Sequence, residues 1–206
     1  TRTFRGFARH TKYLRAGMSE PVEQPPVAPR LGDPAGARKT VSIRLATLAD
    51  AEAIRTIYNV EVENHTSTFD LVARSVEEQR SWLTERSGAF AAVVATMANR
   101  DGEERVVGFA SLSPYKERAA YRPTVENSVY VSRDHGGLGI GRTMMEHLIE
   151  LARDSGFHSM IARIEARSEA SRALHVACGF ELVGVEKEVG RKFNRWLSTA
   201  VMQKML

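Results

Sequence analysis

Residues 129–143 have the sequence Val-Tyr-Val-Ser-Arg-Asp-His-Gly-Gly-Leu-Gly-Ile-Gly-Arg-Thr, and this stretch carries the strongest structural signal in the chain. It begins with an apolar, strand-like segment, Val129–Val131, and from Met144 onward the apolar residues have helical spacing. The six residues 136–141 include four glycines. Glycine lets the backbone approach a ligand closely, and the first turn of a helix presents unpaired N–H groups and a dipole that favour an anion. We therefore expect this loop to bind a phosphate or pyrophosphate.

Two common phosphate-binding patterns do not fit this loop. A dinucleotide fingerprint requires a third glycine where the chain has Arg142 or Met144. The phosphate loop of nucleotide hydrolases fits Gly136 and Gly141 but needs Lys where Arg142 stands, and the 65 residues after Gly141 are too few for the remainder of that sheet. A plain tight turn is disfavoured by the number of glycines.

The rest of the chain alternates between strand and helix signals. Strand-like alternation begins at Val41, and capping-box patterns that start at Thr47 and Ser75 mark two helices. Further strands are expected over 90–95, 106–112, 128–131, 160–164, 180–185 and 200–206, and further helices over 144–152 and 171–178. The order β-α-α-β-β-β-α-β-α-β-β predicts one α/β domain with a mixed sheet over residues 41–206.

Residues 1–40 differ from this domain in charge and composition. They hold eight Lys or Arg, three Asp or Glu, and five of the seven prolines. Their net charge is therefore +5, and the chain's net charge of +4 leaves −1 for residues 41–206. We expect a disordered tail, and the nearly neutral domain argues against nucleic acid as a partner. Residues 1–18, which are basic and amphipathic, are either residues upstream of a true start at Met18 or a membrane-surface or targeting segment.

Composition excludes several other classes. The longest nearly apolar run, Gly88–Ala98, is shorter than the ~20 residues of a bilayer span, so we expect no membrane partner. The single cysteine, Cys178, excludes a disulfide scaffold, and no His, Asp or Glu cluster has metal-ligand spacing. Because the N-terminus also lacks a secretory signal pattern, we expect a soluble, cytoplasmic protein without a metal.

The glycine-rich stretch resembles the acyl-coenzyme A loop of the GNAT family of N-acetyltransferases. In that family a strand leads into Arg/Gln-x-x-Gly-x-Gly/Ala; here Gly139 and Gly141 occupy the small positions, and Gly136 stands at the Arg/Gln position. The segment Ser168–Phe180 resembles the family's Asn-x-x-Ser-x-x-x-Tyr-x-x-x-Gly-Phe, with Ser for Asn and His for Tyr. The resemblance implies a single GNAT-type domain, a mixed and mostly antiparallel sheet flanked by helices, and acetyl-CoA as co-substrate.

Several stretches resemble one branch of the family, the phosphinothricin and methionine sulfoximine N-acetyltransferases. They are Ile43–Asp50, Ile57–Asn59, Thr66–Phe69, Glu126–Val131 with His175, and Val189–Leu197. The chain departs from the branch at Asn194 and Ser198, where Gly and Asp are usual. The branch implies acetylation of the α-amine of a small amino-acid analogue by a homodimer. Acetylation of another amine or of a protein N-terminus, and a non-catalytic acyl-CoA sensor, are the alternatives.

The resemblance also assigns candidate cofactor-binding residues. Main-chain groups of Val129, Tyr130 and Val131 are expected to hold the pantetheine arm as an added strand does, and one of their N–H groups to stabilise the oxyanion. The other candidates are Gly137, Leu138, Gly139, Ile140, Gly141, Arg142 and Ser168.

Acetyl transfer to a free amino acid requires a base, because the amine arrives as an ammonium ion. Glu126, just before the strand that leads to the loop, is the candidate base, directly or through one water; a surface carboxylate is the alternative. His175 is a candidate to protonate the departing thiolate or help deprotonate the amine; a packed helix histidine is the alternative. Cys178 stands where the family has an apolar residue, so we expect it to pack in the core.

The acceptor pocket must hold a small zwitterion. Basic residues in the loop before Glu126 offer charge-assisted hydrogen bonds to a carboxylate or phosphinate, unless they are solvated loop charges, and Phe69 offers an apolar wall. The candidate substrate-binding residues are Phe69, Lys116, Glu117, Arg118, Glu126, Asn127 and Ser128.

Overall fold

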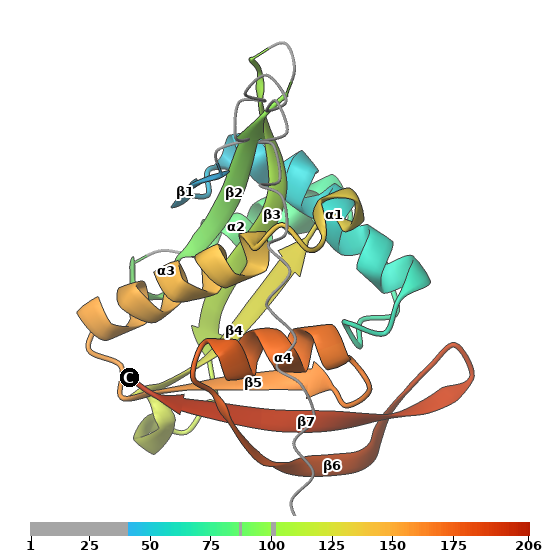
Figure 1. Ribbon diagram of the computed structural model, residues 1–206, viewed down its shortest axis with the longest axis vertical. Helices are drawn as coiled ribbons and strands as arrows, with labels where there is room; N and C mark the ends of the chain where they lie inside the picture. The colour runs from blue at the N-terminus through green and yellow to red at the C-terminus, as the bar shows by residue number, and fades with distance from the viewer. Residues whose placement is uncertain (1–40, 87, 100–101) are drawn as a thin grey trace, which may run out of the picture. The chain divides into compact units, whose positions relative to one another are not determined.

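The computed structural model describes residues 41–86, 88–99 and 102–206, so the predicted tail lies outside the described residues. The elements are β1 (Val41–Leu45), α1 (Ala51–Asn64), α2 (Val76–Thr84), β2 (Ala92–Ala98), β3 (Glu104–Pro114), β4 (Thr124–Val131), α3 (Ile140–Asp154), β5 (Ser159–Glu165), α4 (Glu169–Ala177), β6 (Glu181–Lys192) and β7 (Arg195–Met205) (Figure 1). This order confirms the predicted one. Among the described residues, no helix has both the length and the apolar character needed to cross a bilayer.

The seven strands form one sheet in the order β1-β2-β3-β4-β5-β7-β6. Among the strands of residues 41–206 that the structure describes, only β4 and β5 are parallel neighbours, which confirms a mixed and mostly antiparallel sheet. The β4–β5 ladder ends at Glu126 opposite Ile161, whereas the β3–β4 ladder continues to Val131. The two parallel strands therefore separate beyond Glu126, and Figure 1 shows β4 rising away from β5.

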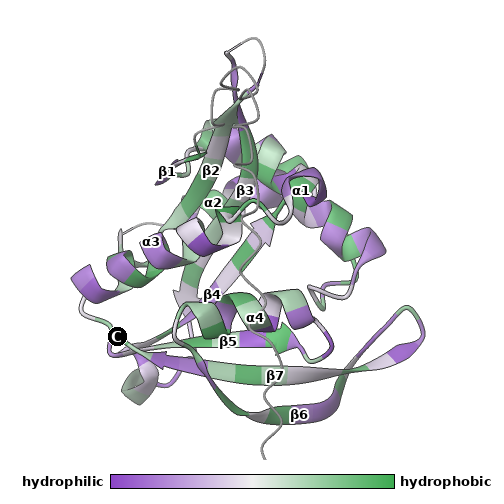
Figure 2. Cartoon of the chain, viewed as in Figure 1, coloured by the Kyte–Doolittle hydropathy of each residue, from purple (hydrophilic) through white to green (hydrophobic). Residues whose placement is uncertain are grey.

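Apolar side chains pack against both faces of the sheet. On one face, α3 contributes Met144 and Leu148 to a cluster that also includes Cys178, as the apolar position of this cysteine predicts. On the opposite face, Tyr58 of α1 packs with Phe109 of β3 in a second cluster. Figure 2 shows the corresponding alternation of hydrophobic and hydrophilic residues along α3. Helices thus cover both faces of the part of the sheet that contains β2 and β3.

The two predicted helix starts agree with the structure to different degrees. The Arg44 guanidinium donates two hydrogen bonds of 2.8 Å to the Asp50 carboxylate, which also accepts the Thr47 backbone N–H at 2.8 Å. A 3-10 turn follows Thr47, so α1 begins later than that pattern indicates. The capping box at Ser75 is confirmed: its N–H donates to Glu78 Oε2 at 2.7 Å, and its Oγ accepts the Glu78 N–H at 3.1 Å.

Several strands extend beyond their predicted bounds, and β4 matters most for the site. The sequence predicts a strand from Ser128, but β4 begins at Thr124 because its polar first half pairs with β3 on one side and β5 on the other. Glu126 therefore lies inside the strand instead of before it. The predicted strand over 180–185 likewise continues to Lys192, since β6 and β7 form one long hairpin.

The tip of the β6–β7 hairpin is attached to the loop that follows α1. The buried Lys192 ammonium donates hydrogen bonds to the backbone carbonyls of Thr68 at 2.8 Å and Glu61 at 3.2 Å. The Phe69 ring lies against Gly190, where any Cβ would collide with it. We call these contacts of Lys192 and Gly190 the hairpin bridge.

The two departures from the acetyltransferase branch have structural roles in this hairpin. Asn194 has a φ of 58° in the two-residue turn, a conformation that Asn tolerates, and its Oδ1 accepts a 2.6 Å hydrogen bond from Arg191. Ser198 Oγ accepts the Glu188 N–H at 3.0 Å, where the β6–β7 register shifts. Both substitutions therefore fit the hairpin.

Candidate active site

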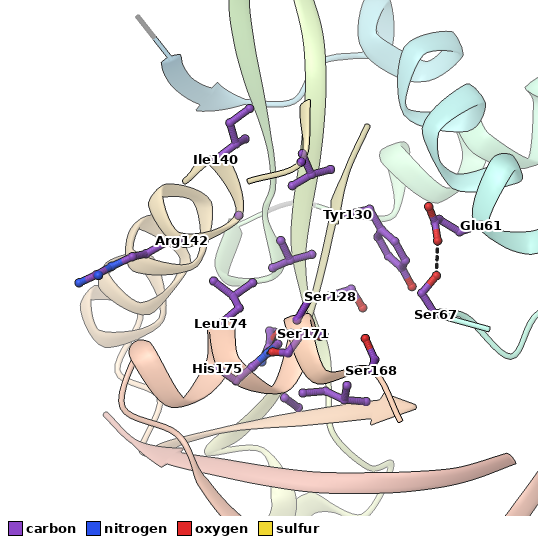
Figure 3. A pocket seen from close by; sticks show the side chains of 18 of the residues that line it. Glu61, Ser67, Ser128, Tyr130, Ile140, Arg142, Ser168, Ser171, Leu174 and His175 are labelled. Carbon is purple, nitrogen blue, oxygen red and sulfur yellow. Dashed lines mark hydrogen bonds between the residues drawn. The ribbon is translucent and has the colours of Figure 1, made fainter. Parts of the chain in front are cut away.

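The separation of β4 and β5 opens into a cavity of about 560 Å³. Figure 3 shows α4 along one side, Ser128 and Tyr130 of β4 in the middle, and Glu61 with Ser67 at the far end. The cavity is lined by Glu61, Ser67, Asn127, Ser128, Val129, Tyr130, Val131, Ser132, Arg133, His135, Gly136, Gly137, Gly139, Ile140, Gly141, Arg142, Ala162, Arg163, Ile164, Glu165, Ser168, Ala170, Ser171, Leu174 and His175. The predicted glycine loop, Ser168 and His175 thus surround one space.

The glycine loop has a conformation that only glycine adopts readily. Gly137 and Gly139 have φ values of 76° and 80°, and Gly139 is the N-cap of α3. The first hydrogen bond of the helix runs from the Thr143 N–H to the Gly139 carbonyl at 3.1 Å, so the N–H groups ahead of it are available to a ligand. Gly141 has another role, because an added Cβ would lie 3.3 Å from Leu174 of α4. This cradle fits the pyrophosphate of acyl-coenzyme A.

We expect Gly139→Ala to weaken acetyl-CoA binding about 10-fold, since a Cβ at this φ costs about 1–2 kcal/mol. Gly136→Ala is the matched control in the same loop, because Gly136 has a φ of −63° and an added Cβ would make only an ordinary contact at 3.5 Å. Isothermal titration of both variants checks this. Equal loss in both, or in neither, would contradict the role of the loop conformation.

The backbone of β4 provides a second binding element. Beyond Glu126 this strand keeps its ladder with β3 but has left β5, and residues 127–131 line the cavity. An extended chain can therefore form hydrogen bonds with this edge as an added strand does. Val129, Tyr130 and Val131, which the sequence predicts to hold the pantetheine arm, all line the cavity.

His175 lines the cavity from α4 but is only 4% exposed. Its Nε2 lies 3.1 Å from Asn127 Oδ1 and its Nδ1 lies 2.8 Å from the Ser171 carbonyl. Burial lowers the pKa of His175, and the Ser171 contact opposes this shift. The Asn127 amide in turn donates to the Ile161 carbonyl at 3.0 Å, which joins β4 to β5 where they begin to separate. The expected substrate contact Asn127 is therefore engaged with the protein.

Glu126 lies on the face of β4 opposite to Asn127 and is half-buried. It is not among the residues that line the cavity. Its register partners are Ser113 of β3 and Ile161 of β5. Burial raises the pKa of this carboxyl, Glu186 adds to the rise, and Arg163 opposes it. A carboxylate with a raised pKa, at the last residue where β4 pairs with β5, has the properties of a general base.

The far end of the cavity contains a buried carboxylate that sequence reasoning did not find. Glu61 accepts hydrogen bonds from Arg133 Nε at 2.8 Å and Nη2 at 2.6 Å, and from the Ser67 hydroxyl (Figure 3). Burial alone would raise the pKa of Glu61, but these bonds outweigh it and lower the pKa. The pair ties α1 to the segment that leads into the glycine loop.

Several predicted residues lie outside this cavity. Lys116, Glu117 and Arg118 line a separate pocket of about 470 Å³ together with Tyr121. Phe69 packs in the hairpin bridge and not on the cavity wall.

Two residues of the glycine loop also differ from expectation. Leu138 is exposed and is not a lining residue. The Arg142 side chain points away from the cavity in Figure 3 and pairs with Glu146 at 2.8 Å. Within the described ranges, no three His, Cys, Asp or Glu side chains gather as a metal site would require.

Sequence reasoning missed Glu61, Arg133 and Arg163. Arg133 lies two residues after Val131, at the start of the glycine-rich loop, and this position could have marked it as a cavity residue. Nothing in the local pattern marks the other two, because β5 and α1 reach the cavity only through tertiary packing.

Comparisons with known proteins agree with this geometry. The profile of the family described as "Acetyltransferase (GNAT) domain" matches residues 43–201. The L-methionine sulfoximine/L-methionine sulfone acetyltransferase of Pseudomonas aeruginosa is 38% identical over 165 residues, which cover 80% of this chain and 94% of the relative.

Two solved structures extend the comparison. A phosphinothricin acetyltransferase from Sinorhizobium meliloti in complex with AcCoA has a TM-score of 0.75 and 38% identity, covering 81% of this chain and 89% of that one. The ribosomal-protein-alanine N-acetyltransferase from Brucella melitensis has a TM-score of 0.75 and 43% identity, covering 80% and 99%. The chain therefore belongs to the GNAT family, as an acyltransferase that depends on acetyl-CoA.

Proposed function

We propose that this enzyme acetylates the α-amine of a small amino-acid analogue of the methionine sulfoximine, methionine sulfone or phosphinothricin type. The observation that carries the proposal is the half-buried Glu126 at the last β4–β5 pair, where the opening begins. Relatives at 36–38% identity that are named for these acceptors support the substrate class.

When bound, acetyl-CoA supplies an acyl thioester. The N–H groups of the glycine loop would hold its pyrophosphate, and the free edge of β4 would hold its pantetheine arm. Glu126 removes a proton from the acceptor ammonium, directly or through one water, and an N–H of Val129–Val131 donates to the thioester oxygen. A C–N bond forms, the C–S bond breaks, and the proton that nitrogen loses after attack goes to the departing sulfur.

His175 is best explained as a positioning residue in this scheme. Both of its ring nitrogens face oxygen atoms of the protein, and its contact with Asn127 lies where β4 leaves β5. We assign it the task of fixing that separation. The homodimer implied by the resemblance stays a prediction.

Acetylation of a protein N-terminus is the second candidate, and one observation favours it. The Brucella melitensis structure named a ribosomal-protein-alanine N-acetyltransferase is 43% identical to this chain.

Thiol release from acetyl-CoA by the full chain tests the proposal. The panel holds methionine sulfoximine, phosphinothricin, methionine sulfone, ordinary amino acids and a peptide that begins with alanine. We expect saturable release with the first three. Release with the peptide alone would replace the proposal by the second candidate, and release with none of the acceptors would contradict both.

A further inference from the structure

Three charged side chains alternate in sign on the face of the sheet that carries Glu126. Strand β5 places Met160, Ala162 and Ile164 in the α3 cluster, so Arg163 lies on the opposite face, which it shares with Glu126. Arg163 lines the cavity, and its Nη2 lies 2.5 Å from Oε2 of Glu186 on β6. The order across this face is carboxylate, guanidinium, carboxylate.

Among the arginines that line the cavity, Arg163 is the one that shares a sheet face with Glu126 and has an exposed, exchangeable partner. Arg133 is held by Glu61, whose side chain is only 5% exposed and which also binds Ser67. Arg142 points away from the cavity and pairs with Glu146. In the Arg163–Glu186 pair the side chains are 37% and 40% exposed, and such a solvated pair contributes little to stability. A carboxylate that enters the cavity can therefore replace Glu186.

We propose that Arg163 binds the carboxylate of the acceptor amino acid, which displaces Glu186, while the acceptor's ammonium faces Glu126. An α-amino acid carries these two groups on the same carbon, and the two protein charges lie on neighbouring strands of one face. A guanidinium forms bidentate hydrogen bonds with a carboxylate. An amine without a carboxylate leaves Arg163 paired with Glu186. This assignment rests on the proposed function, because it requires an acceptor that has both groups.

The test measures kcat and KM of the full chain for methionine sulfone and for its decarboxylated analogue, 3-(methylsulfonyl)propylamine. We expect Arg163→Gln to raise KM for methionine sulfone about 10-fold or more and to leave KM for the amine unchanged. Arg105→Gln, at an exposed ion pair on β3, is the matched control and should change neither value. An equal effect of Arg163→Gln on both acceptors, or no effect on either, would overturn the assignment.

Glu186→Gln is a second variant that does not depend on the stability of the first. It frees Arg163, so KM for methionine sulfone should fall; a rise would overturn the assignment. The pH profiles of the two variants supply a further measurement. They would not change if Arg163 and Glu186 only stabilised the fold. Glu186 raises and Arg163 lowers the pKa of Glu126, so the acidic limb of kcat/KM for the amine should move to lower pH in Glu186→Gln and to higher pH in Arg163→Gln.

The same experiment separates failure of this assignment from failure of the proposed function. A wild-type enzyme that acetylates methionine sulfone, with no selective effect of Arg163→Gln, would leave the function standing and remove the assignment. A wild-type enzyme that acetylates only amines without a carboxylate, or only peptides, would remove both.

Discussion

Glu126→Gln should lower kcat by about 10²–10⁴-fold and leave the affinity for acetyl-CoA unchanged. The glutamine keeps the shape of the side chain but cannot accept the proton of the acceptor ammonium, and general-base catalysis is typically worth this factor. Glu126 is not a lining residue of the cavity that contains the glycine loop, so the binding of acetyl-CoA should not respond. Steady-state kinetics measures the loss of kcat, and isothermal titration on the same preparation measures the affinity for acetyl-CoA.

The pH profile of the wild type provides a further check. Burial raises the pKa of Glu126, so kcat/KM should fall as the pH drops through that raised value and the base becomes protonated. The kcat/KM of Glu126→Gln should not show this fall at low pH. Glu150→Gln, an exposed site on α3, is the matched control and should behave as wild type. A Glu126→Gln variant that retains more than about a tenth of wild-type kcat would show that another group is the base, because general-base catalysis contributes at least ~10²-fold.

Arg133→Met should destabilise the folded domain by about 2 kcal/mol, because it leaves the Glu61 carboxylate buried without its cation. For a domain of this size the corresponding fall in Tm is about 4–8 °C. Arg105→Met removes an arginine from a pair whose side chains are both 70% exposed and should cost less than about 0.5 kcal/mol. Chemical denaturation and calorimetry of the three proteins measure these differences.

The pH dependence of stability tests the same Arg133–Glu61 ion pair. Because Arg133 and Ser67 lower the folded-state pKa of Glu61, this pair stabilises the protein above the unfolded-state pKa, and the contribution is lost as the pH falls through the folded-state pKa. The stability difference between wild type and Arg133→Met should therefore be largest near neutral pH and shrink in acid. A difference that stays constant between neutral and acidic pH would contradict the ion pair as its source.

Local sequence signals were sufficient for the order of elements and for the backbone conformation of the glycine loop. The positive φ of Gly137 and Gly139 is a backbone requirement that appears directly as glycine in the sequence. The apolar spacing of α3 and the Ser75 capping box are likewise determined within one or two turns. Features of this kind follow from residues that are neighbours in the chain.

The acceptor side could not be predicted in the same way, because it depends on pairing between distant strands. The start of β4 was missed because Glu126 and Asn127 do not alternate with apolar residues, and only the two flanking ladders make this segment a strand. Arg163 reaches the cavity because β5 diverges from β4. Lys192 joins β6 to a loop more than a hundred residues earlier. The loop with Lys116 precedes Glu126 closely in sequence, yet it lines a different pocket.

Competition between two acceptors tests the central claim most directly. The full chain is incubated with acetyl-CoA, methionine sulfone and an alanine-starting peptide at equal concentrations, and the acetylated products are identified by mass spectrometry for wild type and Glu126→Gln. We predict acetyl on the α-nitrogen of methionine sulfone with wild type and, over the same time, at least about 10²-fold less with the variant. Acetyl on the peptide alone, or equal product with both proteins, would contradict the account.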